Sequence, residues 1–264
     1  MNICLCVKQV PDTNLIKIDP VTHTLVRKGV PSIVNPFDTY AEELGARMIE
    51  QTGGRMIVIT MGPPQAAKAL TSCMEVGADG AYLITDRAFG GSDTLATSYI
   101  LATAIREVEK RESLKFDLIL CGKQAADGDT AQVGPEIAEH LNCAQITYAV
   151  NAKPEADRII VKRETDGGYE WVETRLPAVV TVARTEFEPR YATISTRRRA
   201  RSAVIPTLTR AELPEIDPAR CGLSGSPTKV KNTYTPETAK QSVVFHGADG
   251  ARALAELLKE KRIL

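Results

Sequence analysis

The sequence predicts an α/β protein with a doubly wound, mainly parallel sheet and helices on both faces. Short apolar runs alternate with helix-like segments over the first 150 residues, which is typical of this class. The chain of 264 residues, 43% of them apolar, is long enough to bury a large core. Its 33 basic and 33 acidic side chains cancel, so the overall charge favours neither nucleic acid nor an anionic membrane as a partner.

Five apolar runs of strand length predict the parallel strands, at residues 2–7, 55–60, 80–85, 118–120 and 146–148. Helices are predicted from Asn35-Pro36, over 65–76, from Ser92-Asp93-Thr94 and from Glu136. Period-two alternation around Asp19-Pro20 predicts an inserted hairpin over 16–26.

After residue 150 the pattern changes to that of antiparallel strands. Alternating residues on either side of Asp166-Gly167-Gly168 predict a second hairpin over 158–175. The apolar run 176–182 is expected to join the main sheet. Four of the five residues 197–201 are arginines, which suits either a solvated helix face or an acidic partner. The run has no interleaved aromatics, which argues against single-stranded nucleic acid.

Residues 206–236 are rich in Pro, Ser, Thr and Gly and hold few apolar side chains. Because such a stretch cannot build its own core, we expect it to lie on another protein or to be mobile. A last helix is predicted over 248–260. The expected organisation is therefore an α/β domain of residues 1–205 and a C-terminal arm and helix of residues 206–264 that pack on a partner subunit.

The cysteines and the hydropathy pattern bear on location. The six cysteines are scattered without a C-x-x-C pair, and the histidines form no metal-type cluster, so we expect buried thiols and no metal site. The sequence contains no run of about 18 apolar residues and begins at once with a strand-like run. We expect a cytoplasmic protein without membrane insertion.

The segment 121–135 has the composition of a phosphate-binding loop. It follows a buried strand, contains several small residues and Lys123, and ends with Thr130 as the expected cap of the next helix. The Walker A and G-x-G-x-x-G patterns are both missing, so an ordinary strand-to-helix connection stays an alternative. Four connections, 8–12, 35–38, 86–94 and 122–130, are expected along one edge of the sheet, where such sheets bind ligands.

Five segments together resemble the β subunit of electron-transfer flavoprotein, in order and over nearly the whole chain: 7–12, 35–38, 122–129, 162–181 and 188–193. The resemblance implies a heterodimer with an α subunit that carries the redox FAD. It also implies that the β-subunit cleft holds AMP or a second FAD, and that the arm after Pro206 wraps the α subunit.

By this resemblance residues 188–201 form the recognition loop that docks dehydrogenases, with Ile194 as its apolar anchor. Glu164 matches a family glutamate at the subunit interface near the α-subunit flavin. The expected partner-binding residues are Glu164, Pro189, Arg190, Tyr191, Ile194, Arg197 and Arg198.

The choice between FAD and AMP rests on two features. The residues after Asp127 are small and leave space for a flavin, and Thr94 and Thr97 share one helix face. This resembles the branch that performs electron bifurcation. Such a subunit would accept hydride from NADH and send electrons to ferredoxin or flavodoxin and, through the α-subunit FAD, to an acyl-CoA or similar dehydrogenase. A subunit with structural AMP and a stand-alone adenine-nucleotide-binding enzyme stay as alternatives.

The expected cofactor-binding residues come from all four connections and the strand ends. They are Cys6, Lys8, Asn35, Asp38, Met61, Asp93, Thr94, Thr97, Gly122, Lys123, Gln124, Asp127, Gly128, Asp129, Thr130, Ala131, Gln132 and Val133. We assign Lys8, Lys123 and the 122–130 backbone to phosphates, Asn35 and Asp38 to sugar or adenine, and the Cys6 and Met61 backbone to adenine. No catalytic residue of the chain itself is expected, because the flavins carry the chemistry, and NADH oxidation is expected only in the αβ complex.

Overall fold

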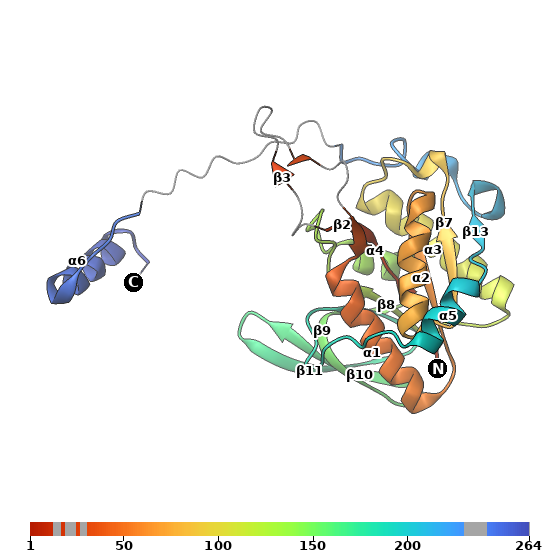
Figure 1. Ribbon diagram of the computed structural model, residues 1–264, viewed down its shortest axis with the longest axis horizontal. Coiled ribbons are helices and arrows are strands. Elements are labelled where there is room, and N and C mark those ends of the chain that lie inside the picture. The colour runs from red at the N-terminus through yellow and green to blue at the C-terminus, as the bar shows by residue number, and fades with distance from the viewer. Residues whose placement is uncertain (13–16, 19–24, 27–30, 230–241, 264) are drawn as a thin grey trace.

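The computed structural model describes residues 1–12, 17–18, 25–26, 31–229 and 242–263 (Figure 1). Its main sheet has nine strands in the order β11-β10-β9-β12-β8-β1-β6-β7-β13. In chain order they are β1 Asn2–Cys6, β6 Arg55–Met61, β7 Gly80–Ile84, β8 Leu118–Gly122, β9 Ala144–Pro154, β10 Arg158–Thr165, β11 Gly168–Arg175, β12 Ala178–Val182 and β13 Thr207–Leu208. In this spatial order, every neighbouring pair from β9 to β13 is parallel. The β9–β10 and β10–β11 pairs are antiparallel. The predicted α/β class with a mainly parallel sheet is confirmed.

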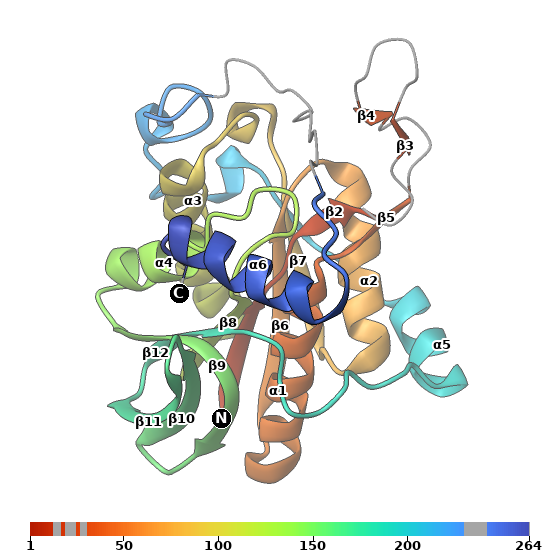
Figure 2. The ribbon, with the colours of Figure 1, turned by 90° about the vertical axis from the view of Figure 1, so that its left-hand side faces the viewer.

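Helices cover both faces of this sheet (Figure 2). The α-helices of the described residues are α1 Pro36–Thr52, α2 Ala67–Val76, α3 Thr94–Glu112, α4 Val133–Leu141, α5 Ile194–Ser202 and α6 Gly247–Glu260, of which α6 does not cover the sheet. Leu44 of α1 and Leu70 of α2 pack with Leu5 of β1 on one face, whereas Ile100 of α3 and Ile137 of α4 belong to the core on the other. The central strands are buried on both faces, which explains their continuous apolar runs.

Two small antiparallel pairs lie outside the main sheet. In the region of the predicted hairpin over 16–26, β3 Lys17–Ile18 pairs with β4 Leu25–Val26, and its turn at Asp19-Pro20 lies outside the described residues. The second pair joins β2 Gln9–Pro11 to β5 Ser32–Val34, and the sequence did not reveal it. This pair brings the ends of the insertion together directly before α1.

Two of the predicted helix caps are wrong. Helix α4 begins at Val133 after Gln132, so Thr130 lies in the preceding loop, where Ala131 adopts a φ of 55°. Asn35 does occupy the N-cap position of α1, but its side chain makes no capping hydrogen bond. The expected Pro36 at the first helical position is present. Asp93 caps α3 as expected, because its Oδ1 accepts from the Ala96 N–H at 3.0 Å.

The expected boundary between the α/β domain and the C-terminal arm, at residue 205, is not where the chain departs from the domain. Strand β13 extends the sheet beside β7, and Leu213 and Ile216 are buried in the core that α3 also fills. The Asp217 N–H donates to the Tyr99 hydroxyl of α3 at 2.8 Å. The sparse apolar residues build no core of their own but complete an existing one, so at least residues 207–228 belong with the α/β domain.

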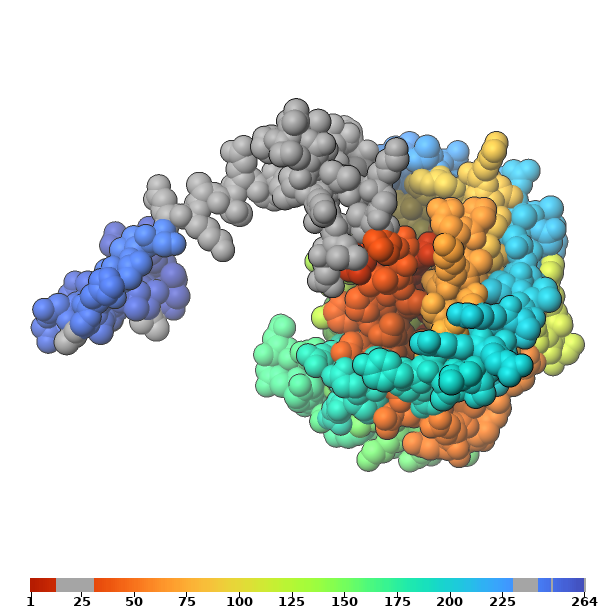
Figure 3. All heavy atoms as spheres, viewed as in Figure 1, coloured from red at the N-terminus to blue at the C-terminus, as the bar shows by residue number. Residues whose placement is uncertain are grey.

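Helix α6 lies apart from the sheet and its covering helices (Figures 1 and 3). Its Leu254 is 42% exposed, and Val243 and Val244 just before it are more exposed still. None of the helices in the described ranges is long and apolar enough to cross a membrane.

Candidate functional site

A cavity of about 330 Å³ lies at the point where the order of the parallel strands reverses. The chain runs from β1 outward through β6 to β7, and then returns to β8 on the other side of β1. Cys6 at the end of β1, Met61 at the end of β6 and Gly122 at the end of β8 line the cavity. Open α/β sheets bind their ligands at this position.

The structure gathers nearly all the expected cofactor-binding residues around this one cavity. Those that line it are Cys6, Lys8, Asn35, Asp38, Met61, Asp93, Thr94, Thr97, Gly122, Lys123, Gln124, Gly128, Thr130, Ala131, Gln132 and Val133. Two expected residues, Asp127 and Asp129, do not. Six further lining residues were not expected: Val7, Ser92, Leu101, Cys121, Ala125 and Gly134. Most of these lie beside an expected residue in the sequence, and Leu101 lies one helical turn after Thr97.

Asp38 ties three of the connections together. Its Oδ2 accepts from the Lys8 N–H at 2.7 Å, and its Oδ1 accepts from the Gly122 N–H and from Asn35 Nδ2, both at 3.0 Å. The carboxyl is buried, and this burial raises the pKa of Asp38 to about 7, although the three donors act in the opposite direction. The carboxyl is engaged by the protein itself, which differs from the sugar or adenine contact expected of it.

Asn35 fixes the loop that follows β8. Its Nδ2 donates to the Gln124 carbonyl at 2.8 Å as well as to Asp38, and its Oδ1 accepts from the Ala126 N–H at 3.0 Å. Both amide hydrogens are used within the chain. The Asn35 side chain therefore supplies hydrogen-bond partners for backbone groups of the loop at Gln124 and Ala126. Because it is used there, it does not cap α1.

Gly122 lets this loop approach α1 closely. A Cβ at this position would lie 2.4 Å from Asp38 Oδ1 and 2.7 Å from Phe37 Cβ, which is closer than real Cβ atoms come. Any larger residue would push the start of the loop away from Asp38. The glycine thus serves the packing of the two connections against each other.

The charged side chains of the loops divide into paired and available groups. Lys8 Nζ pairs with Asp127 Oδ1 at 2.6 Å, and Gln124 Nε2 donates to Asp129 Oδ1, so the two aspartates brace the loop. Lys123 Nζ lies over the Phe37 and Tyr148 rings, 4.9 and 5.9 Å from their centroids. Within the described ranges Lys123 has no ion pair, which leaves its charge for an anion in the cavity.

The N-termini of α3 and α4 meet at the opposite wall of the cavity. Thr94 Oγ1 lies 3.2 Å from Gln132 Oε1 and 3.2 Å from Glu136 Oε1 of α4. Thr94 and Thr97 both line the cavity, as their spacing suggested. Helix N-termini carry partial positive charge, which Asp93 at the N-cap of α3 and Glu136 in the first turn of α4 offset, so Lys123 supplies the charge that favours an anionic ligand.

The expected partner-binding residues fall into two regions. Pro189, Arg190, Tyr191, Ile194, Arg197 and Arg198 lie in one segment over α1 and α2, whereas Glu164 lies apart on the β10–β11 hairpin. Tyr191 is 95% exposed and Ile194 is 83% exposed. The end of the expected recognition loop is helical, because Thr193 caps α5. This agrees with the view of the arginine run as a helix face.

Comparison with known proteins decides the family. The model of the electron transfer flavoprotein domain matches residues 22–213. The electron transfer flavoprotein subunit beta of Thermoanaerobacterium thermosaccharolyticum is 44% identical over 100% of both chains, and that of Megasphaera elsdenii is 45% identical over 100% of this chain and 98% of its own. The chain belongs to the electron-transfer flavoprotein β-subunit family.

The resemblance drawn from the sequence is thereby confirmed at the level of the family. A third relative is the caffeyl-CoA reductase-Etf complex subunit CarD of Acetobacterium woodii, 44% identical over 100% of both chains. Electron-transfer flavoprotein β subunits pair with α subunits and serve electron transfer. The flavoprotein family associates with flavin or nucleotide, and the cavity at the sheet edge is lined by Lys123, which favours an anionic ligand.

Proposed function

We propose that this β subunit binds FAD in the cavity at the strand-order reversal and takes part in electron bifurcation. In this role the αβ complex accepts hydride from NADH and reduces ferredoxin or flavodoxin and, through the α-subunit FAD, an acyl-CoA or related dehydrogenase. The observation that carries the proposal is the joint position of Thr94, Thr97 and the small residues after Asp127 on one cavity.

The residues of this chain bind and orient, and the flavins supply the hydride and one-electron chemistry when bound. Lys123 and the backbone N–H groups at the starts of α3 and α4 would hold the diphosphate, since Lys123 has no ion pair within the described ranges and helix N-termini donate to anions. Asp38 and Asn35 would fix the loop rather than contact the ligand, because their polar atoms already bond within the chain. Thr94 and Thr97 would face the ribityl chain or the diphosphate.

A second candidate is a subunit that holds AMP in place of FAD and performs simple electron transfer. The cavity volume of about 330 Å³ supports it, because this lies at the small end of the range of about 300–1,000 Å³ for ligand pockets. Such a volume suits a mononucleotide without movement of the walls. For FAD the open side of the cavity has to take the isoalloxazine.

The segment with Tyr191 and Ile194 is the proposed docking surface for the dehydrogenase. Large exposed apolar side chains are typical of protein–protein contact sites, and the arginines of α5 add charge that would attract an acidic partner. The relative from Acetobacterium woodii is named for a caffeyl-CoA reductase complex, which supports a CoA-thioester dehydrogenase or reductase as partner. The C-terminal helix α6, with Leu254 exposed, would pack on the α subunit in the cytoplasm.

The bound nucleotides of the purified αβ complex test the proposal directly. The complex is denatured, and released flavin and AMP are quantified by absorbance and chromatography. Two flavins per heterodimer are expected, because each subunit would hold one FAD. One flavin with one AMP would contradict FAD binding here and establish the second candidate. One flavin without AMP would contradict both candidates.

A further inference from the structure

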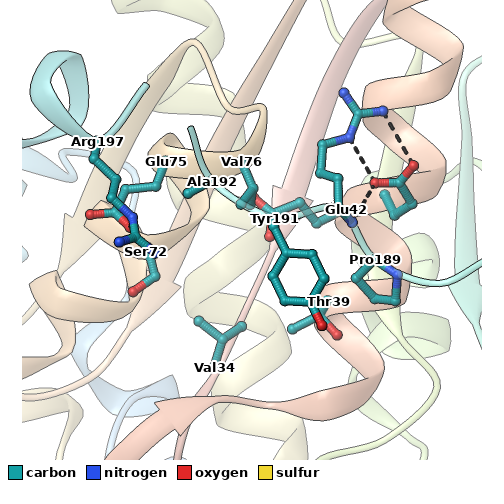
Figure 4. Close-up of a pocket in the computed structure, with 12 residues that line it drawn as sticks. Val34, Thr39, Glu42, Ser72, Glu75, Val76, Pro189, Tyr191, Ala192 and Arg197 are labelled. Carbon is teal, nitrogen blue, oxygen red and sulfur yellow. Dashed lines mark hydrogen bonds and ion pairs between the residues drawn. The ribbon is translucent and has the colours of Figure 1, made fainter. Parts of the chain in front are cut away.

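A second cavity, of about 240 Å³, lies between α1, α2 and the segment 189–197 (Figure 4). It shares no lining residue with the nucleotide cavity. Since one water needs about 10–15 Å³ of such space, the cavity has room for a group of side-chain size. Its walls are partly apolar, with Val34, Val76 and Pro189, and three glutamates also line it: Glu42, Glu43 and Glu75.

Glu42 is the unusual member of this lining. Its side chain is buried, with 5% of the residue exposed, and its Oε1 has no hydrogen-bond partner within the described ranges. The Cys73 thiol of α2 is close enough to the carboxyl to lower its pKa. A buried polar atom without a partner costs about 1–3 kcal/mol. The position of Glu42 on the cavity indicates that a ligand supplies the missing partner.

The arginines nearby leave this carboxyl unmatched. Arg190 donates from Nε to Glu43 at 2.7 Å and from Nη1 to Glu50 at 2.5 Å, so its guanidinium is already used. Arg197 lies beside Glu75 at one end of the cavity, and Pro189 lies at the other (Figure 4). The Arg197–Glu75 distance is 3.6 Å, and the arginine side chain is 57% exposed. Arg197 is therefore weakly held and can be displaced.

The electrostatics around Glu42 favour the entry of a positive charge. Burial raises the pKa of Glu42 well above its ordinary value, and the neighbouring carboxyls of Asp38 and Glu43 on α1 act in the same direction. The Cys73 thiol from α2 and the Arg190 charge from the docking segment lower that pKa, but do not outweigh burial. A cation in the cavity would favour the ionised carboxylate, so its binding would release a proton.

We propose that this cavity binds a guanidinium or primary ammonium group between Glu42 and Glu75, in competition with Arg197. The apolar walls formed by Val34, Val76 and Pro189 would hold the methylene stem of such a group. Two sources share this chemistry: an arginine or lysine side chain of the protein docked on the segment with Tyr191 and Ile194, or a free amine. The site lies directly beneath that segment, which makes docking and cation binding depend on the same residues.

Calorimetric titration of the purified αβ complex tests the site. The probe is ethylguanidinium, and the neutral ethylurea of similar shape is its control. At pH 7, in two buffers of different ionisation enthalpy, we expect saturable binding of ethylguanidinium with proton release, and none of ethylurea. Absence of saturable ethylguanidinium binding up to about 50 mM, or equal binding of ethylurea, would overturn the proposal.

Three variants assign the binding to these residues. Glu42→Gln should weaken ethylguanidinium binding by about tenfold or more and abolish the proton release, because the charge is removed and the shape is kept. Arg197→Ala should strengthen binding by about two- to fivefold, because the internal competitor is lost. Glu139→Gln, on the exposed surface of α4, should bind as wild type. Unchanged affinity in Glu42→Gln would show that the probe binds elsewhere.

The source of the cation is decided by a kinetic measurement that rests on the proposed function. If the source is a side chain of the docked dehydrogenase, ethylguanidinium should raise the KM for that dehydrogenase without lowering kcat. An unchanged KM in the presence of calorimetrically bound probe assigns the site to a free amine. Calorimetry does not depend on electron transfer, so a failure of the proposed function would leave the test of the site intact.

Discussion

Asp38 and Glu42 lie one helical turn apart on α1, and both carboxyls are buried. Asp38 holds the loops of the nucleotide cavity, and Glu42 lines the second cavity. The charge of Asp38 raises the pKa of Glu42, although the two residues line different cavities. The first two turns of α1 therefore connect the nucleotide site with the docking segment.

Replacing Glu42 should change the dependence of stability on pH. Its folded-state pKa is raised, so its contribution is fully present below the unfolded value of about 4.3 and is lost as pH rises toward the folded pKa. Over that interval the loss approaches about 1.4 kcal/mol per pH unit. Glu42→Gln should remove this decline, so that its unfolding free energy exceeds that of wild type increasingly as pH rises above about 5 toward the folded pKa.

Urea denaturation at several pH values measures this difference. Glu139→Gln is the matched control, because the same change on the exposed surface of α4 should leave the wild-type pH profile intact. A profile of Glu42→Gln that runs parallel to wild type would show that Glu42 is ionised in both states.

Thr97→Leu should abolish FAD retention by the αβ complex. Thr97 lines the nucleotide cavity one turn into α3, so a larger apolar side chain would occupy the space and remove a hydroxyl. Thr71→Leu is the control, since Thr71 is half-buried on α2 and does not line the cavity. The flavin content of the purified complexes checks this, and normal flavin in Thr97→Leu would refute the assigned role.

At the scale of elements, Arg190 attaches the docking segment to α1. Its guanidinium contacts Glu43 and Glu50, and its backbone N–H also donates to Glu43 at 3.1 Å. Glu43 is buried, with 3% of its side chain exposed, and the remaining partner would be Arg47. The pair therefore matters more than an exposed ion pair would.

Arg190→Ala should lower the free energy of unfolding by about 2 kcal/mol, because Glu43 keeps only one of its two arginines. Amide hydrogen exchange in residues 190–193 should also become faster. Arg199→Ala, on the exposed face of α5 in the same region, should change neither quantity. Unchanged exchange in Arg190→Ala would mean that other contacts hold the segment.

Some strands and helix ends could be predicted from the sequence, and others could not. The apolar runs of β1, β6, β7 and β8 predict buried strands because both faces of a parallel strand are covered. The Asp93 cap can be predicted from the sequence because the hydrogen bond from the Ala96 N–H spans only three residues. The β2–β5 pair escaped notice because its strands have three residues each and are separated by the insertion.

At the scale of the whole molecule, the place where the α/β domain ends can be tested by truncation. A chain that ends at Lys229 should keep the stability of the domain, because β13 and the buried Leu208, Leu213 and Ile216 remain. A chain that ends at Ile205 should lose about 5 kcal/mol or more, because three large buried side chains are removed.

Thermal unfolding of both truncated chains, each with its α subunit, measures this. Equal melting temperatures would contradict the packing of residues 207–228 on α3 and β7. A lower melting temperature of the Lys229 chain than of the full-length chain would place a stabilising contact after residue 229.

The sequence by itself determined the family, the alternation of strands and helices, and the four connections that line the cavity. These follow from short-range patterns and from motifs that keep their spacing along the chain. Only the tertiary structure decided what the polar residues do there. Asp38 and Asn35 bond to partners up to 91 residues away, and Asp127 pairs with Lys8 across 119. Whether residues 207–228 pack on the α/β domain was likewise decided by the tertiary structure. Their buried side chains complete a core that other segments build, and burial depends on neighbours that are distant in the chain.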